Sequence, residues 1–207
     1  MSSITNTILK FYSEIQRNPQ HRYKSWEHCY RYFCRPDADA DIACLHLAFY
    51  LASWGMYRGS SFLLDKDYTV HRPVTERLLG SREALQGIDP SNIEKKVITI
   101  FDLMAWISKQ YEEAPTTTLV TKILLGTMAC VPAYDQYFIN GLRLSGLPYS
   151  GLKQSNFGKL LSFVQKPGNL AQFEEAQMHI QKVGGKSYPI MKLVDMYFWE
   201  LGKPRKR

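Results

Sequence analysis

The sequence has no long hydrophobic run: no segment holds the roughly 18 uninterrupted apolar residues that a membrane-spanning helix needs. Its first residues, MSSITNTILKFYSEIQR, contain no basic region followed by an apolar core and a small-residue cleavage site. Four cysteines are too few for a disulfide framework in a chain of 207 residues, and buried thiols in a reducing compartment are the simpler interpretation. We therefore expect a cytoplasmic protein with no membrane partner.

Common catalytic and cofactor motifs are also missing. The sequence has no phosphate-binding loop, dinucleotide fingerprint, serine-nucleophile elbow, HExxH pair or iron–sulfur cysteine spacing. A structural zinc site usually has two pairs of ligands, each pair two to four residues apart. Cys29 and Cys34 come close, but Cys44 and His46 are two apart on a predicted helix and point to different sides. We expect no metal and no cofactor.

Positive charge is concentrated in one half of the chain. The 45% hydrophobic and 22% charged content is that of a globular protein, and the net charge is +7. Residues 1–115 contain 14 Lys/Arg and 14 Asp/Glu, whereas residues 116–207 contain 12 Lys/Arg and 5 Asp/Glu. Four of these cations lie in residues 203–207, which we expect to form a basic frayed tail. This distribution favours a polyanionic partner such as DNA and leaves the oligomeric state open.

Apolar residues recur at helical spacing and form no series of alternating strands, so the predicted fold class is all-α. Helices are predicted over residues 4–16, 23–33, 42–54, 74–85 (with a break at Gly80), 91–112, 118–127, 133–143, 156–164, 170–183 and 189–201. We expect one helical domain over 1–202, with a division into two subdomains near residue 148 as the alternative. The segment IACLHLAFYLASW is apolar on nearly every side, which predicts a central buried helix.

The segment YKSWEHCYRYFCR mixes aromatic and basic residues, as nucleic-acid-binding proteins often do. On a helix the aromatic residues share one face: Tyr23, Trp26, Tyr30 and Phe33. The basic residues share another: Lys24, His28, Arg31 and Arg35. Stacking on bases and contact with phosphates are two interpretations, and a core-facing aromatic stripe with a solvated basic stripe is the third.

A second basic feature is Arg58, which lies between two glycines in WGMYRGSSFLL. Backbone N–H groups at a helix start, together with a guanidinium group, would form an anion site. The structural interpretation is a helix-ending glycine followed by a turn and a cap, with Arg58 paired to a carboxylate.

The stretch TKILLGTMACVPAYDQYFINGLR places one lysine in an apolar helix and one aspartate just after a proline. A buried lysine needs a partner or loses its proton, so Lys122 requires an explanation. Pro132 suits the first turn of the next helix, and Asp135 would follow within that turn, where free N–H groups stabilise a carboxylate. Two helices joined so closely would pack antiparallel and bring Lys122 near Asp135. The structural interpretation is therefore an ion pair or a helix-start carboxylate.

This arrangement resembles part of the helix–hairpin–helix DNA glycosylase superfamily, in which a lysine-bearing helix, a short connection and a proline precede an aspartate at the start of the next helix. The resemblance implies that Asp135 is the catalytic residue and that two helical lobes enclose a cleft. The segment PIMKLVDMYFWELG also resembles closing helices of glycosylase-like proteins. The cations expected to contact nucleic acid are Arg58, Lys122, Lys153, Lys159, Arg205, Lys206 and Arg207.

The sequence also departs from this family pattern. EEAPTTTLVTK replaces the glycine-rich hairpin before the Lys122 helix, and the interval of 13 residues from Lys122 to Asp135 is short for the family. LQGIDPSNIEKKV is similar to such a hairpin, with Asp89 where a second glycine is usual, but it lies far upstream. We therefore expect a divergent family member and leave its catalysis open. The other interpretation is a helical protein-interaction module without catalytic activity.

Overall fold

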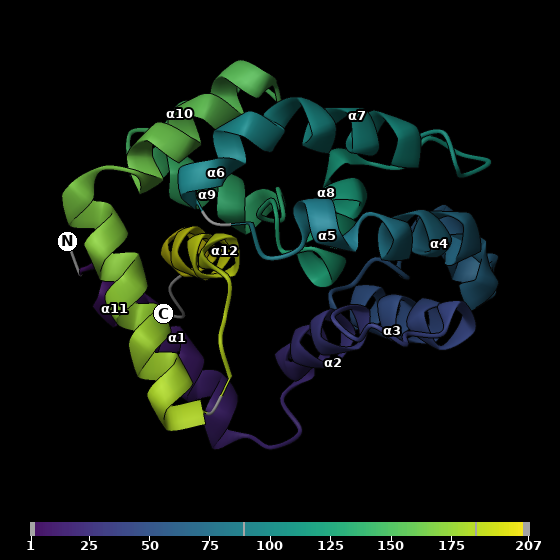
Figure 1. Cartoon of the computed structure of the whole chain (residues 1–207), viewed down its shortest axis with the longest axis horizontal. Coiled ribbons are helices and arrows are strands. Elements are labelled where there is room, and N and C mark those ends of the chain that lie inside the picture. The colour runs from purple at the N-terminus through teal and green to yellow at the C-terminus, as the bar shows by residue number, and fades with distance from the viewer. Residues whose placement is uncertain (1–2, 89, 185, 205–207) are drawn as a thin grey trace.

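The computed structural model describes residues 3–88, 90–184 and 186–204, and all regular elements in these ranges are helical (Figure 1). The α-helices are α1 (Ile4–Arg17), α2 (Ser25–Phe33), α3 (Ala40–Ser53), α4 (Arg72–Gly80), α5 (Arg82–Leu85), α6 (Pro90–Ile93), α7 (Val97–Ile107), α8 (Thr117–Thr127), α9 (Gln136–Leu144), α10 (Gln154–Val164), α11 (Pro167–Gly184) and α12 (Ile190–Gly202). Short 3-10 turns are η1 (Arg22–Lys24), η2 (Phe62–Asp65), η3 (Tyr68–His71) and η4 (Glu94–Lys96). The predicted all-α fold class is confirmed.

Local signals explain several helix ends. The Asp39 side chain accepts hydrogen bonds from the N–H groups of Asp41 and Ile42, both at 2.9 Å, and so caps α3. The predicted break near Gly80 is present between α4 and α5. In place of the one helix predicted over 91–112, the chain forms α6, η4 and α7, and α7 ends at Ile107. The hydroxyl group of Ser108 donates a hydrogen bond to the carbonyl of Met104 at this end.

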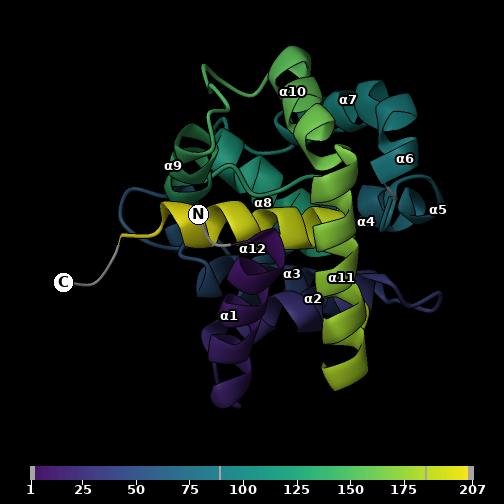
Figure 2. The same ribbon diagram turned by 90° about the vertical axis from the view of Figure 1, so that its left-hand side faces the viewer.

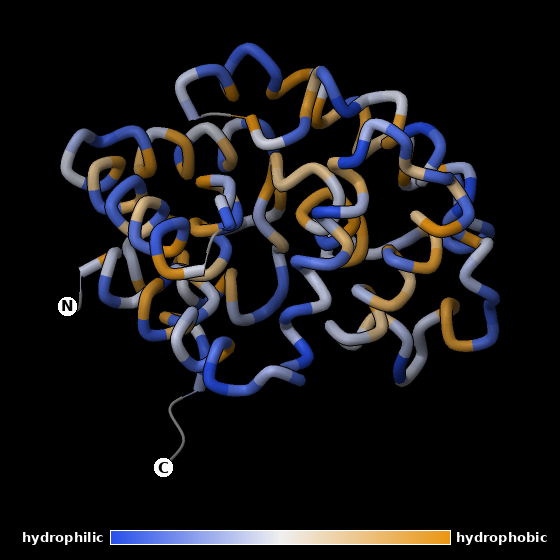
Figure 3. The backbone as a smooth tube through the Cα atoms, turned by 60° about the horizontal axis from the view of Figure 1, so that its bottom comes forward, coloured by the Kyte–Doolittle hydropathy of each residue, from blue (hydrophilic) through white to orange (hydrophobic). Residues whose placement is uncertain are grey.

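The centre of the molecule is α12 (Figure 2). It packs against α9, α1 and α11, and every residue from Ile190 to Trp199 is buried. Most other helices alternate hydrophobic and hydrophilic residues along their turns (Figure 3), as expected of helices with one buried face. The helix that the sequence analysis placed at the centre, α3, is more peripheral.

One face of α3 is exposed, which corrects the prediction of a fully buried helix. Leu47, Tyr50 and Leu51 are completely buried. In contrast, Ile42, Leu45 and Phe49 are 42%, 43% and 63% exposed. Apolar composition alone did not distinguish a buried helix from one with an exposed apolar stripe.

The connection near residue 148 does not separate two cores. Leu142 on one side of it and Phe157 on the other belong to one cluster of buried hydrophobic side chains, which runs from Ile4 to Trp199. The buried cluster is continuous across this connection, and the extent of the domain stays a prediction.

Two glycines allow α9 and α12 to approach closely. A Cβ atom at Gly141 in α9 would overlap the carbonyl oxygen of Phe198 in α12. A Cβ atom at Gly202, the last residue of α12, would overlap the carbonyl oxygen of Tyr137 in α9. The backbones of the two helices are therefore in direct contact, and this contact sets the position of the start of α9.

Gly141→Ala should lower the free energy of unfolding by about 1–3 kcal/mol, because the added methyl group has no room. The matched control is Gly158→Ala in the interior of α10, where a Cβ atom meets nothing within 4 Å. That substitution should raise the free energy of unfolding by about 0.5–1 kcal/mol through helix propensity alone. Urea denaturation measures both, and equal effects of the two substitutions would contradict close contact between α9 and α12.

His71 is fully buried and bonded on both sides of its ring. Its Nε2 lies 2.8 Å from the hydroxyl oxygen of Tyr57, and its Nδ1 lies 2.8 Å from that of Tyr111. A neutral imidazole donates one hydrogen bond and accepts one, so it can satisfy both hydroxyl groups. Burial lowers the pKa of His71 to about 4.

The free energy of unfolding should therefore fall as the pH is lowered from 6.5, the ordinary pKa of histidine, to about 4. In this window the unfolded chain binds a proton at His71 and the folded protein does not, which corresponds to a loss of up to about 3 kcal/mol. Chemical denaturation at several pH values measures this dependence. His71→Gln keeps one donor and one acceptor but does not titrate, so the free energy of unfolding of this variant should depend less on pH in this window. The same pH dependence in the variant and the wild type would show that other groups cause it.

Candidate functional site

The connection between α8 and α9 runs back along α8 without regular secondary structure. The N–H of Tyr134 donates to the Thr121 hydroxyl at 2.9 Å, and the Thr118 hydroxyl donates to the carbonyl of Tyr134 at 2.9 Å. The connection starts at Ala129, whose φ of 50° is the one positive value among the described non-glycine residues. A left-handed residue that is not glycine is strained, here at the point where the chain reverses.

This path corrects two predictions about α9. The helix starts at Gln136, so Pro132 lies in the connection and not in the first turn of a helix. The main packing partner of α9 is α12, so α8 and α9 do not form the antiparallel pair that the short connection suggested. The connection nevertheless brings the chain back to Lys122, as the sequence analysis expected for Asp135.

Asp135 is the N-cap residue of α9. Its Oδ1 accepts hydrogen bonds from the N–H groups of Tyr137 and Phe138, both at 3.1 Å. Its Oδ2 lies 3.2 Å from the Nζ of Lys122. The ion pair and the helix-start carboxylate are thus both present, and 17% of the Asp135 side chain is exposed. Its catalytic role stays a prediction.

Lys122 is buried, with 3% of its side chain exposed. Burial lowers the pKa of its ammonium group, while the charge of Asp135 and their hydrogen bond act in the opposite direction. Its Nζ lies 4.7 Å from the ring centroid of Trp54. A direct contact between Lys122 and a nucleic-acid phosphate, as predicted, is not compatible with this burial.

A second lysine–aspartate pair lies beside the first and was not predicted. Lys192 and Asp195, on α12, are 3.1 Å apart, with 5% and 2% of their side chains exposed. The other oxygen of Asp195 accepts a hydrogen bond from the N–H of Ala133 at 3.0 Å. The Lys192 Nζ lies 5.2 Å from the ring centroid of Trp54, so both ammonium groups approach the same indole.

These groups form a charged cluster, defined here as Lys122, Asp135, Lys192 and Asp195. Burial raises the pKa of Asp195, and the nearby Lys192 opposes this shift. Two polar atoms close to the cluster, the Tyr50 hydroxyl and the Trp54 Nε1, are buried without a hydrogen-bond partner among the described residues. The interior around the charged cluster therefore keeps unused hydrogen-bonding capacity.

Aromatic side chains connect the charged cluster to the surface. The rings of Trp54 and Tyr23 are stacked, with centroids 4.3 Å apart and planes 15° apart. Tyr137 is 37% exposed, and its ring lies 5.3 Å from that of Trp199. Asp135 and these rings therefore lie together at the start of α9.

The structure supports the turn-and-cap interpretation of the Arg58 segment. Gly55, with a φ of 76°, ends α3, and the N–H of Met56 donates to the carbonyl of Leu51 at 2.9 Å. Ser61 caps the short turn η2 through the N–H of Leu63. Arg58 itself is exposed, and its guanidinium group lies against Gly55. It forms no ion pair among the described residues, so the expected pairing with a carboxylate is not observed.

The other predicted cations are dispersed. Lys153, at the start of α10, and Lys159, within it, are exposed, and neither has an ion pair within the described ranges. Residues 205–207, which hold Arg205, Lys206 and Arg207, lie outside the described residues. Nucleic-acid binding by these cations stays a prediction.

The aromatic residues of α2 are mainly core residues, in agreement with the third interpretation of that segment. Trp26 is 2% exposed, and its Nε1 donates to the carbonyl of Leu125 at 2.9 Å. Phe33 is completely buried, whereas His28 and Arg31 are exposed. Trp26 and Phe33 are therefore not placed to stack on bases.

The described ranges contain neither a metal-binding group of side chains nor a membrane-spanning helix. No group of three or more His, Cys, Asp or Glu side chains there is arranged to hold a metal ion. No helix there combines the length and apolar character that crossing a bilayer requires.

The comparisons with known proteins assign no family. No family model matches this chain, and neither a curated protein nor a solved structure matches it. The resemblance to helix–hairpin–helix glycosylases thus depends on the residues quoted above and stays a prediction.

Asp135→Asn should lower the free energy of unfolding by about 1–3 kcal/mol, because an asparagine can still cap α9 but leaves Lys122 without an anion. Adding Lys122→Met should restore part of this loss, since removing both charges costs less than leaving one buried and unpaired. Denaturation of wild type, both single variants and the double variant completes a mutant cycle. Additive effects would show that the two side chains do not stabilise each other.

Proposed function

We propose that the protein is a divergent helix–hairpin–helix glycosylase-like protein that binds nucleic acid through its basic C-terminal half, with Asp135 as the residue that acts on the sugar. The charged cluster carries this proposal. Four charged side chains are brought together among aromatic rings, and one of them, Asp135, keeps part of its side chain exposed.

The contribution of the charged cluster to the stability of the fold does not by itself explain its presence. Burying charged groups has a large desolvation cost, and replacing a buried ion pair by apolar residues is often neutral or stabilising. Titratable groups with shifted pKa values are concentrated at functional sites. Burial shifts the pKa of Lys122 downward and that of Asp195 upward, in agreement with a functional role for the cluster.

Hydrolysis of a glycosidic bond is the reaction proposed for Asp135. In the proposed reaction a water oxygen bonds to the anomeric carbon while the bond from that carbon to the base breaks. The electron pair of that bond leaves with the base, which takes up a proton from solvent, and Asp135 afterwards releases to solvent the proton that it accepted. Asp135 accepts a proton from the water and stabilises positive charge that develops on the sugar. Lys122, 3.2 Å away, and the two N–H groups of α9 hold the carboxylate in place.

The C-terminal segment supports nucleic-acid binding by its position. Gly202 packs on the carbonyl of Tyr137, two residues after Asp135. The chain therefore leaves α12 beside the start of α9, and its last five residues include four cations. Lys203 lies 3.6 Å from Glu14 and 3.5 Å from Glu200, so the cations after it are the better candidates for phosphate contacts.

Binding to duplex DNA should weaken steeply with salt, with a slope of about −0.9 in log–log form for each phosphate neutralised. Replacing Arg205, Lys206 and Arg207 by glutamine should make the slope shallower by up to about 2.7 and leave thermal unfolding unchanged. Fluorescence anisotropy at several salt concentrations measures this. Absence of binding at low salt, or an unchanged slope, would overturn nucleic-acid binding by this segment.

Catalysis is tested separately, with oligonucleotides that carry oxidised, alkylated or deaminated bases. Base release should be lost in Asp135→Asn and retained in Asp65→Asn, which removes an exposed carboxylate elsewhere. Because Asp135→Asn also affects stability, activity is compared at a temperature where both variants are folded. If the wild-type protein releases none of these bases, the catalytic part of the proposal fails while DNA binding can still hold.

A helical interaction module is the second candidate, because α3 exposes an apolar stripe. Ile42, Leu45 and Phe49 follow helical spacing and are between 42% and 63% exposed. Two such stripes could pack against each other in a dimer of this chain. A wild-type dimer that becomes monomeric in Phe49→Lys, as measured by sedimentation, would favour this function; a monomeric wild type would argue against it.

A further inference from the structure

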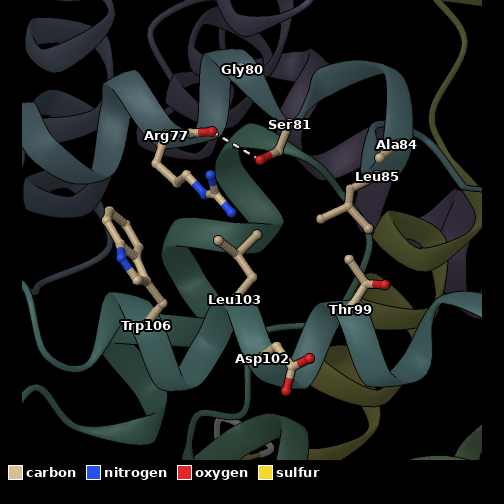
Figure 4. A pocket seen from close by; sticks show the side chains of 9 residues that line it. All are labelled: Arg77, Gly80, Ser81, Ala84, Leu85, Thr99, Asp102, Leu103 and Trp106. Carbon is tan, nitrogen blue, oxygen red and sulfur yellow. Dashed lines mark hydrogen bonds between the residues drawn. The ribbon is translucent and has the colours of Figure 1, made fainter.

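A pocket lies between α4–α5 and α7, and none of its lining residues belongs to the charged cluster (Figure 4). Its volume is about 560 Å³. Pockets of about 300–1,000 Å³ typically hold small organic ligands. Leu85 and Leu103, which are 1% and 6% exposed, provide apolar lining.

Charged and aromatic side chains line the same space. The guanidinium group of Arg77 points into the pocket, and its Cζ lies 5.9 Å from the ring centroid of Trp106 (Figure 4). Asp102 and Thr99 lie on the α7 side. Arg77 and Asp102 are both exposed, and neither forms an ion pair in the part of the chain that the structure describes. Each charge is therefore free to bind a ligand.

From this arrangement we infer that the pocket binds a small anion with a planar aromatic base, of the nucleoside monophosphate class. Arg77 binds the phosphate, since a guanidinium group donates two parallel hydrogen bonds to such an oxyanion. The base lies over the indole of Trp106, because aromatic side chains stack on every base. Asp102 accepts a hydrogen bond from an amino group at the edge of the base. This site is independent of the function proposed for Asp135.

The pair of opposite charges narrows the ligand class. A simple anion such as inorganic phosphate gains from Arg77 but is repelled by Asp102, and it leaves the apolar lining unused. A neutral nucleoside covers that lining but leaves Arg77 without an anion. A nucleoside monophosphate uses all three features of the pocket.

Isothermal titration calorimetry of the full chain with adenosine monophosphate, adenosine and inorganic phosphate tests this inference. We expect adenosine monophosphate to bind, adenosine to bind at least about tenfold more weakly, and phosphate alone to show no binding. Arg77→Gln and Asp102→Asn should each weaken binding of adenosine monophosphate by about tenfold. No binding of adenosine monophosphate, or equal affinity for all three probes, would overturn the inference.

Gly80 offers a test that leaves the charged residues in place. It lines the pocket, and a Cβ atom there meets nothing within 4 Å, so Gly80→Leu should fill the space and keep the fold. The control is Gly158→Leu on α10, which has the same free space but lies outside the pocket. Nucleotide binding should be lost only in Gly80→Leu, with DNA binding unchanged in both. Retained nucleotide binding in a folded Gly80→Leu protein would place the ligand elsewhere.

Discussion

The carboxylate of Asp195 holds the connection between α8 and α9 in place, and the arrangement of the charged cluster depends on it. One of its oxygens binds the N–H of Ala133, and the other binds the ammonium group of Lys192. Asp195 belongs to α12, the most buried helix, so these bonds attach the connection to the centre of the core. Asp135 follows Ala133 by two residues. Its position beside Lys122 therefore depends on α12, through Ala133, and on α8, through Tyr134, and not on packing between α8 and α9.

The sequence predicted local features well and long-range ones poorly. The meeting of Lys122 and Asp135 was predictable because a buried lysine needs an anion, and the short connection after its helix returns the chain toward it. The start of α9 was predicted too early because a proline such as Pro132 is common in the first turn of a helix. In the structure the N–H groups of the next two residues donate to the side chains of Thr121 and Asp195, and the helix begins only after them. The pair on α12 was missed because charges three residues apart are also common on exposed helix faces. Only tertiary packing shows that these charges are inside.

The charged cluster and the contact between α9 and α12 have different physical roles. The glycine contact is short and rigid, since two backbones touch without side chains between them. The charged cluster contains groups whose protonation depends on their surroundings, and two nearby polar atoms have no partner among the described residues. Side chains in functional sites need surrounding residues that hold them rigidly in place. In this protein the same helix, α12, provides both.

The place of α12 in the chain has a consequence for folding. The helices that pack around α12 all precede it in the sequence, so a ribosome produces them first. Until α12 emerges, the apolar faces of α1, α9 and α11 lack the surface that covers them, and Lys122 lacks the α12 side chains beside it. At synthesis rates of about 5–20 residues per second, the stretch from the end of α11 to the end of α12 takes about 1–4 s to make, and the incomplete state lasts at least that long. Substitutions that slow the docking of α12 should therefore increase aggregation during synthesis even where they leave the stability of the finished protein unchanged.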